Sequence, residues 1–123
     1  MAKTQHDTDR FARSPCPIAC TLDILGDKWT LLVVRDLRSG KKTYTALQQS
    51  PEKIPSNILA DRLKRLVEHG IIEKRAYQQH PVRYEYALTD KGKALGKVLQ
   101  AMVKWGEEHI PGSKALMKPP AKL

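Results

Sequence analysis

The chain has 123 residues, 41% of them hydrophobic, which suffices for one domain with one core and excludes a disordered polyelectrolyte. Its 22 Lys and Arg against 13 Asp and Glu give a formal charge of +9, which favours a polyanionic partner, although a soluble basic domain has the same composition. No segment reaches the roughly 20 apolar residues of a membrane span. Residues 1–14 are too polar for a secretory signal, so we expect a cytoplasmic protein with no membrane partner.

The hydrophobic pattern divides the chain into three segments. Residues 1–15 are polar and predict a flexible arm. Residues 16–110 carry a periodic apolar pattern throughout and predict the folded domain. Residues 111–123 contain three Pro, one Gly and three Lys, and predict a mobile basic tail.

Two helices are predicted at the start of the folded domain. Pro17 suits the first position of a helix, and Gly26 ends this helix after Leu25. Asp27 is expected to cap the second helix, which Ser39 and Gly40 end. The apolar residues of the second helix recur at helical spacing: Trp29, Leu32, Val33 and Leu37.

A short strand over 42–44 and a short helix capped by Thr45 and ending at Gln49 are predicted next, followed by a loop with two prolines. A longer helix is predicted over 56–69, ended by Gly70. Its expected core face consists of Leu59, Leu63, Leu66 and Val67. Its opposite face is mostly polar or basic, and consists of Asn57, Ile58, Asp61 and Arg65, flanked by Arg62 and Lys64.

The period then changes from helix to strand. Residues 71–77 and 83–88 predict a β-hairpin, joined by residues 78–82, with Tyr84, Tyr86 and Leu88 on one expected core face. Thr89 is expected to cap a last helix that runs to about residue 110. Its apolar stripe is too wide for the little core that remains, so we expect a dimer interface at Leu95, Val98, Leu99, Met102 and Val103.

This order of elements predicts an α+β, mainly α, winged helix-turn-helix fold with terminal dimerisation helices. Such folds place a recognition helix in the DNA major groove, with the hairpin, or wing, beside it. We therefore expect a homodimer that binds a palindromic operator in double-stranded DNA. The expected DNA contacts are Tyr44, Ser56, Asn57, Ile58, Asp61, Arg62, Lys64, Arg65 and Arg83.

Four of these assignments have alternatives. The basic residues of helix 56–69 also suit a solvated face. Asp61 either meets DNA or pairs with Arg65 four residues on. Tyr44 suits a phosphate contact and core packing about equally. Arg83 either enters a minor groove or pairs across the hairpin with the region of residues 73–74.

Several segments carry a family resemblance. They are residues 16–18 (CPI), 22–29 (LDILGDKW), 54–63 (IPSNILADRL) and 83–92 (RYEYALTDKG). In this order, over about three quarters of the chain, they resemble the HxlR-type regulators, which are related to MarR-type winged-helix proteins. The resemblance implies a dimeric transcriptional repressor or activator. It also implies sensing of oxidants or electrophiles by Cys16, the cysteine before Pro17, while Cys20 departs from the usual pattern.

The position of Cys16 gives a physical reason for reactivity. Free amides at a helix N-terminus favour a thiolate, and Arg13 is expected to add positive potential. A buried inert thiol is the alternative. Cys20 lies four residues on, where a disulfide to Cys16 within one helix is geometrically poor, so a bond between subunits or to a small thiol is easier.

Two other classes of function stay open. A small thiol–disulfide redox protein would use both cysteines, but their spacing is not Cys-x-x-Cys and no βαβ pattern surrounds them. An RNA-binding module would show aromatic residues on an open sheet. The sequence has no Gly-rich phosphate loop, catalytic triad or carboxylate pair, and its four His lack metal-ligand spacing. We therefore expect neither an enzyme nor a bound cofactor or metal.

Overall fold

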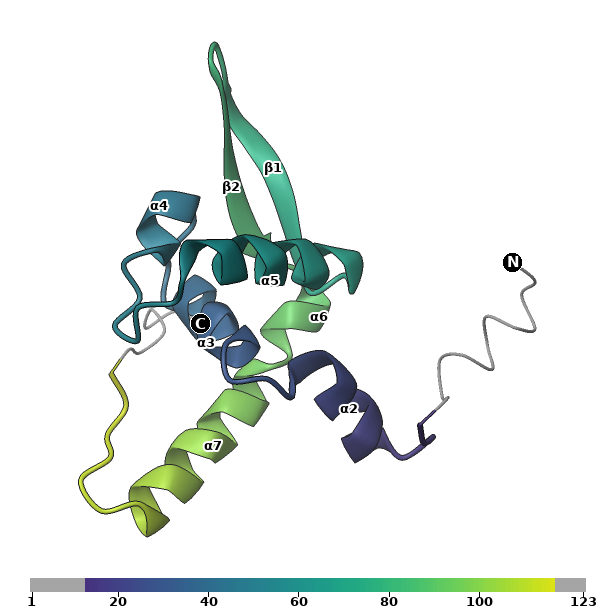
Figure 1. Ribbon diagram of the computed structural model, residues 1–123, viewed down its shortest axis with the longest axis vertical. Coiled ribbons are helices and arrows are strands. Elements are labelled where there is room, and N and C mark those ends of the chain that lie inside the picture. Colours follow the sequence, from purple (N-terminus) through teal and green to yellow (C-terminus); the bar gives the residue numbers. More distant parts are fainter. Residues whose placement is uncertain (1–12, 117–123) are drawn as a thin grey trace.

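The computed structural model describes residues 13–116, so most of the predicted arm and the end of the predicted tail lie outside the described residues. Figure 1 shows a helical body from which a two-stranded hairpin projects at one end and the last helix at the other. The elements in chain order are α2 (Pro17–Leu25), α3 (Thr30–Arg38), α4 (Tyr44–Leu47), α5 (Ser56–Glu68), β1 (Ile72–Gln79), β2 (Val82–Leu88), α6 (Asp90–Lys93) and α7 (Gly96–His109). This is the predicted winged helix-turn-helix fold, mainly helical.

The core lies where α3, α5 and the base of the hairpin meet. Val34 and Leu59 are fully buried, and one face of α5 is buried along its length. The remaining buried apolar residues are Leu25, Val33, Leu37, Leu47, Ile54, Leu63, Leu66, Ile71 and Ile72. Val67, predicted on this core face, is 39% exposed, so that prediction is wrong.

Side chains cap two of the early helices. The Asp27 Oδ2 accepts hydrogen bonds from the amides of Trp29 (3.0 Å) and Thr30 (3.2 Å), as predicted for the start of α3. Thr43, not Thr45, caps α4 by accepting from the Ala46 amide at 3.1 Å. The predicted strand over 42–44 is wrong, because the chain here makes only one backbone bond to the hairpin, from the Tyr86 amide to the Lys42 carbonyl (2.7 Å).

The hairpin is longer and its turn tighter than predicted. The strands extend to Gln79 and from Val82, so the turn is His80 and Pro81, joined by a cis peptide bond. Ile72 lies opposite Leu88, and the register shifts between residues 76 and 78. Because the outer half projects beyond the body (Figure 1), Tyr84 is 47% exposed. Its predicted core position is therefore wrong.

The predicted last helix is broken in two at residues 94–95. Thr89 caps α6 as expected, accepting from the Gly92 amide at 3.2 Å. Gly92 is buried against the backbone of Ile71, just before β1, where a Cβ on residue 92 would lie 2.1 Å from the Ile71 carbonyl oxygen. At Gly96 a Cβ would lie 2.8 Å from the Arg38 Nε. Two glycines four residues apart weaken the helix between them, which explains the break.

Candidate nucleic-acid interface

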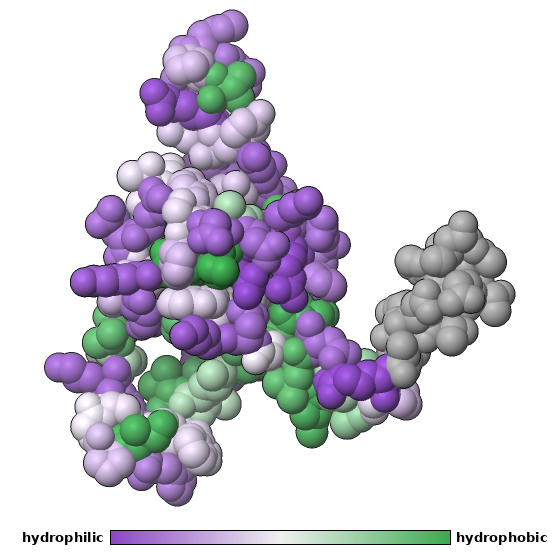
Figure 2. Space-filling model, viewed as in Figure 1, coloured by the Kyte–Doolittle hydropathy of each residue, from purple (hydrophilic) through white to green (hydrophobic). Residues whose placement is uncertain are grey.

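The outward face of α5 is polar and open to solvent. Burial of Leu59, Leu63 and Leu66 fixes which side of the helix meets the body. At about 100° per residue, the opposite side consists of Asn57, Ala60, Asp61 and Lys64, all exposed. We call these four residues the outer face of α5. Figure 2 shows hydrophilic side chains gathered over this part of the molecule.

The N-terminus of α5 is held in place by α4. The Tyr44 hydroxyl donates to the Ser56 carbonyl oxygen at 2.8 Å and lies 2.6 Å from the Ser56 Oγ. The Gln48 amide donates to the same Oγ at 3.3 Å, and the Tyr44 ring packs against the core. Tyr44 therefore positions the start of α5. Within the described chain no side chain caps this terminus and no acidic residue occupies its first turn.

The loop between α4 and α5 is tied to α3 by a bidentate ion pair. The two terminal nitrogens of Arg35 donate to the Glu52 carboxylate at 2.8 and 2.6 Å, and its Nε donates to Asp36 at 3.0 Å. Hydrogen bonds from Arg35 lower the pKa of Glu52 to about 2. Sequence reasoning missed this pair, because its partners are 17 residues apart and no local pattern joins them.

Arg62 is half-buried at the contact of α5 with the start of α3. Its Nε donates to the Asp27 carboxylate at 2.8 Å, it also pairs with Asp61, and its side chain is only 15% exposed. Burial opposes ionisation of Asp27, but hydrogen bonds from Thr30, Arg62 and the Trp29 amide outweigh it and hold the pKa well below its usual range.

Arg62 therefore anchors α5, although the sequence grouped it with the expected DNA contacts. Ile58, from the same group, packs partly against the core. Lys64 is exposed, and the structure gives it no ion pair within residues 13–116. Arg65 lies 3.9 Å from the Asp61 carboxylate, which confirms the alternative in which these two residues pair.

The wing presents Arg83 beside its turn. Arg83 is exposed and lies opposite Gln78, so the alternative of pairing with residues 73–74 is wrong. The cross-strand ion pair of the hairpin joins Arg75 to Glu85 instead, at 3.5 Å. Arg83 is the second residue of β2, next to the turn that joins the two strands, and Figure 1 shows the hairpin projecting beyond the helical body.

The two cysteines lie at the start of α2 in different surroundings. Cys16 is exposed at the N-cap position, and the backbone amides of Ala19 and Ile18 lower the pKa of its thiol. The expected help from Arg13 is wrong, since that side chain pairs with Asp23 at 2.8 Å. Cys20 is half-buried and its thiol donates to the Ser14 carbonyl oxygen at 3.3 Å.

The expected dimer stripe of α7 is divided between two environments. Leu95 and Leu99 pack partly against the core. Val98, Met102 and Val103 are 38%, 53% and 41% exposed. Ile18 and Leu22 of α2, together with Trp105 and Ile110, add further exposed apolar surface. Figure 2 shows this hydrophobic surface in the lower part of the view, where Figure 1 places α2 and α7.

Other kinds of site find little support in the part of the chain that the structure describes. Residues 13–116 contain no group of three His, Cys, Asp or Glu placed to hold a metal ion. Over the same residues, no helix combines the length and apolar character needed to cross a bilayer.

A polar recognition helix, a preceding short helix and a hairpin beside them define a winged helix-turn-helix transcriptional regulator. A family model described as HxlR-like helix-turn-helix matches residues 24–114. The chain belongs to this family, as its sequence motifs predicted, and its fold has MarR-family structural neighbours.

Three relatives illustrate the similarity. YdeP of Bacillus subtilis, an uncharacterised helix-turn-helix-type transcriptional regulator, is 36% identical over 76% of this chain and 73% of its own length. The reduced transcriptional regulator YodB from B. subtilis has a TM-score of 0.68 at 31% identity, covering 80% of this chain and 98% of YodB. The redox regulator HypR in its reduced form has a TM-score of 0.69 at 31% identity, covering 76% and 92%. Oxidised HypR and diamide-treated YodB also match.

Proposed function

We propose that this regulator binds double-stranded DNA sequence-specifically, as a homodimer on a palindromic operator, and thereby represses or activates transcription. The observation that carries the proposal is the outer face of α5, which is polar and exposed while its opposite side is locked into the core. A helix of 13 residues presented this way has the size and chemistry to enter a major groove.

The residues of this surface take different roles. The Asn57 amide suits the paired donor and acceptor of an adenine edge. Lys64 supplies a charge for a phosphate. The uncapped amides at the start of α5 suit a second phosphate, and Ser56 and Tyr44 hold them in position. Arg83 of the wing suits a narrow minor groove.

Asp61, Arg62 and Arg65 support this surface from within α5. Arg62 bonds to Asp27 and Asp61, and Asp61 in turn lies beside Arg65. We infer that Asp61 orients the Arg65 side chain toward the DNA backbone. Ile58 contributes packing beneath the outer face.

The proposed dimer uses the exposed apolar residues of α2 and α7. Ile18 is 71% exposed and Met102 is 53% exposed, both on helices at the end of the molecule away from the wing (Figure 1). Exposed apolar patches of this kind are typical of protein interfaces. A two-fold axis there would place two α5 helices on one DNA molecule, which a palindromic site requires.

A mobility-shift titration against the DNA upstream of the regulated gene tests the proposal. Wild-type affinity should fall about 10³-fold or more between about 50 and 200 mM salt, because Lys and Arg contacts release condensed counterions. Asn57→Ala should lose about 1–3 kcal/mol on the operator and little on other duplexes. Lys64→Ala should lower the affinity for every duplex by the same factor. The control Lys97→Ala, on α7, should change neither the affinity for the operator nor that for other duplexes. Equal weak binding to all duplexes, or preference for single-stranded RNA, would contradict the proposal.

A second function is supported by the exposed Cys16 and its lowered pKa. We propose that Cys16 senses oxidants or electrophiles, because the similar proteins include HypR, a redox regulator in reduced and oxidised forms, and diamide-treated YodB. Diamide would take two electrons and two protons from two thiols, which join as a disulfide, and would itself become the hydrazine. With a quinone, the thiolate would instead attack a ring carbon to form a C–S bond, and the ring, on taking up the thiol proton, would become the hydroquinone. Cys20 is the resolving thiol, reached in the partner subunit.

Three proteins test this sensor role: wild type, Cys16→Ser and Cys20→Ser, each treated with diamide. Wild type should form a reducible cross-linked dimer on a non-reducing gel and change its DNA affinity. Cys16→Ser should do neither. A Cys16→Ser protein that responds as the wild type does would remove Cys16 from the role, and thiol-exchange activity without DNA binding would favour the redox-protein alternative.

A further inference from the structure

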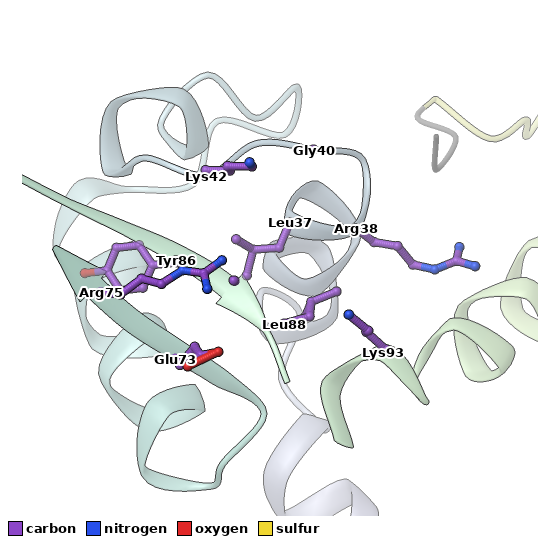
Figure 3. Close-up of a pocket in the computed structure, with 10 residues that line it drawn as sticks. Leu37, Arg38, Gly40, Lys42, Glu73, Arg75, Tyr86, Leu88 and Lys93 are labelled. Atoms are coloured by element: carbon purple, nitrogen blue, oxygen red, sulfur yellow. The ribbon is translucent and has the colours of Figure 1, made fainter. Parts of the chain in front are cut away.

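The two faces of the wing differ in charge. Because side chains alternate along a strand, residues 73, 75, 85 and 87 share one face, and residues 72, 74, 84, 86 and 88 share the other. On the first face Arg75 pairs with Glu85 at 3.5 Å. Figure 3 shows Glu73 and Arg75 of this face beside the end of α3 and α6. This face therefore carries two carboxylates against one arginine, whereas the other, which we call the lysine face, carries Lys74 and no acid.

The lysine face begins in the core, next to the recognition helix. Ile72, at its base, is buried, and β1 packs against α5. Lys74 follows on the same face, two residues or about 7 Å further along the strand. It is exposed, and within residues 13–116 the structure gives it no ion pair with a carboxylate. A full positive charge thus lies where the wing leaves the body, beside α5.

The ring of Tyr84 holds this lysine. The Lys74 Nζ lies 4.4 Å from the centroid of the Tyr84 ring, within the range of a cation–π contact. Lys74 is directly opposite Tyr86, so Tyr84 is its diagonal neighbour across the strands. Unlike a carboxylate, an aromatic ring restrains the ammonium without neutralising its charge. Tyr84, exposed although its strand position is that of a core residue, has no other polar contact in the described part of the chain.

We propose that Lys74 contacts a DNA phosphate and that Tyr84 is the residue that positions it. This inference rests on the proposed function and adds to it which face of the wing meets DNA. The lysine face turns toward the backbone that borders the major groove occupied by α5, and the face of Arg75 and Glu85 points away from it. Because the ring already restricts the lysine side chain, less conformational entropy is lost when the phosphate binds.

Anisotropy titrations with a mixed-sequence duplex at several KCl concentrations test the proposal, since a phosphate contact is independent of sequence. Lys74→Gln should lower the slope of log affinity against log salt by about one. Tyr84→Leu should weaken binding about two- to fivefold and lower this slope in the same direction, whereas Tyr84→Phe, which keeps the ring, should bind as the wild type does. The variant with both Lys74→Gln and Tyr84→Leu should bind like Lys74→Gln alone. Additive losses would mean that the ring touches DNA itself and would overturn the positioning role.

Tyr77→Leu is the matched control, since Tyr77 is an exposed tyrosine of the same hairpin for which the described residues supply no cation over the ring. It should leave affinity and salt slope unchanged, and a loss equal to that of Tyr84→Leu would overturn the proposal.

NMR of the full-length protein without DNA tests the contact between the ring and the lysine separately. The Lys74 protons next to Nζ should be shifted upfield by the ring current in the wild type and in Tyr84→Phe, but not in Tyr84→Leu. Absence of this shift in the wild type would overturn the inference. A wild type that binds no duplex would overturn the proposed function as well, whereas one that binds no better than Tyr84→Leu would overturn this inference alone.

Discussion

The Arg35–Glu52 pair ties the loop before α5 to α3. The loop before α5 contains Lys53 at a φ of 59°, a left-handed conformation that a lysine adopts only when its surroundings fix it. Glu52, next to it, is fixed by two hydrogen bonds from Arg35, and the Ser50 hydroxyl donates to the same carboxylate at 3.1 Å. One carboxylate thus determines the path of the loop that leads into α5.

We expect Glu52→Gln to lower the free energy of unfolding by about 2 kcal/mol at pH 7, allowing for partial solvent screening. The pKa of Glu52 is lowered from 4.5 to about 2, so its contribution is complete above pH 4.5 and is lost as the pH falls toward 2. Urea denaturation of both proteins across this range should show the stability difference closing.

The matched control for this prediction is Glu68→Gln, an exposed carboxylate at the end of α5 outside the network. It should change stability little and with no such trend. A difference between wild type and Glu52→Gln that stays constant from pH 7 to pH 2 would contradict the assignment.

Asp27 and Arg62 show which contacts could be predicted from the sequence and which could not. Asp27 was predictable as a cap, because a short acidic side chain before an apolar stripe is a local signal. Its second partner, Arg62, was not, because the two are 35 residues apart in the chain. Arg62, Lys64 and Arg65 look alike in a helical projection, and only the position of α3 separates the buried anchor from the exposed lysine.

At the scale of elements, α5 is tied to the body by α3, by α4 and by the hairpin. The tie to α3 is the Asp27–Arg62 pair, in which Arg62 is 15% and Asp27 26% exposed. Asp27 directly follows Gly26, the residue that ends α2, so this pair connects the junction of α2 and α3 to the middle of α5. Loss of this pair would weaken the attachment of α5 to α3 while leaving the side chains of the outer face in place.

A double-mutant cycle measures this tie. With Asp27→Asn and Arg62→Met, unfolding in urea should give a coupling energy of about 1–2 kcal/mol, because each single change leaves a partly buried charge without its partner. The exposed pair Asp61–Arg65, at 3.9 Å, is the comparison and should couple by less than about 0.5 kcal/mol. Equal coupling in the two cycles would contradict the anchoring role.

The elements themselves were largely predictable from period and capping. The ends of α2 and α5 and the change to a hairpin follow from Pro17, Gly70 and the alternation after it, and the Gly70 φ of 72° confirms the C-terminal role. The break between α6 and α7 was not predicted. Its cause is the low helix propensity of Gly92 and Gly96, at positions where the Ile71 carbonyl and Arg38 leave no room for a Cβ.

At the scale of the whole molecule, exposed apolar surface is concentrated at one end. Most of the exposed large hydrophobic residues lie on or next to α2 and α7, whereas the outer face of α5 is mainly polar (Figure 2). This distribution suits the proposed dimer contact at one end and the proposed DNA contact at the other. The sequence predicted the apolar stripe of α7, but the division between Leu99, packed inward, and Met102, exposed, depends on how α7 leaves the body.

Met102→Glu should dissociate the proposed dimer, because it would place an unpaired charge in a desolvated contact. Sedimentation should show a monomer, and binding to a palindromic duplex should be lost while the fold, checked by circular dichroism, is kept. Lys104→Glu, on the same helix and also exposed, is the control and should remain dimeric. A dimeric Met102→Glu protein would place the interface elsewhere.

The wing carries a further consequence for how copies of this protein meet. Its sheet has two strands among the described residues, so each strand has an outer edge with backbone groups that another chain could pair with. The Lys42 carbonyl covers one edge near Tyr86, but the edges farther out have only side chains to protect them. Lys74, Arg75 and Arg83 supply charge there, and the irregular register near Tyr77 twists the ribbon. The charge of these three residues therefore also keeps the wing from growing into an intermolecular sheet.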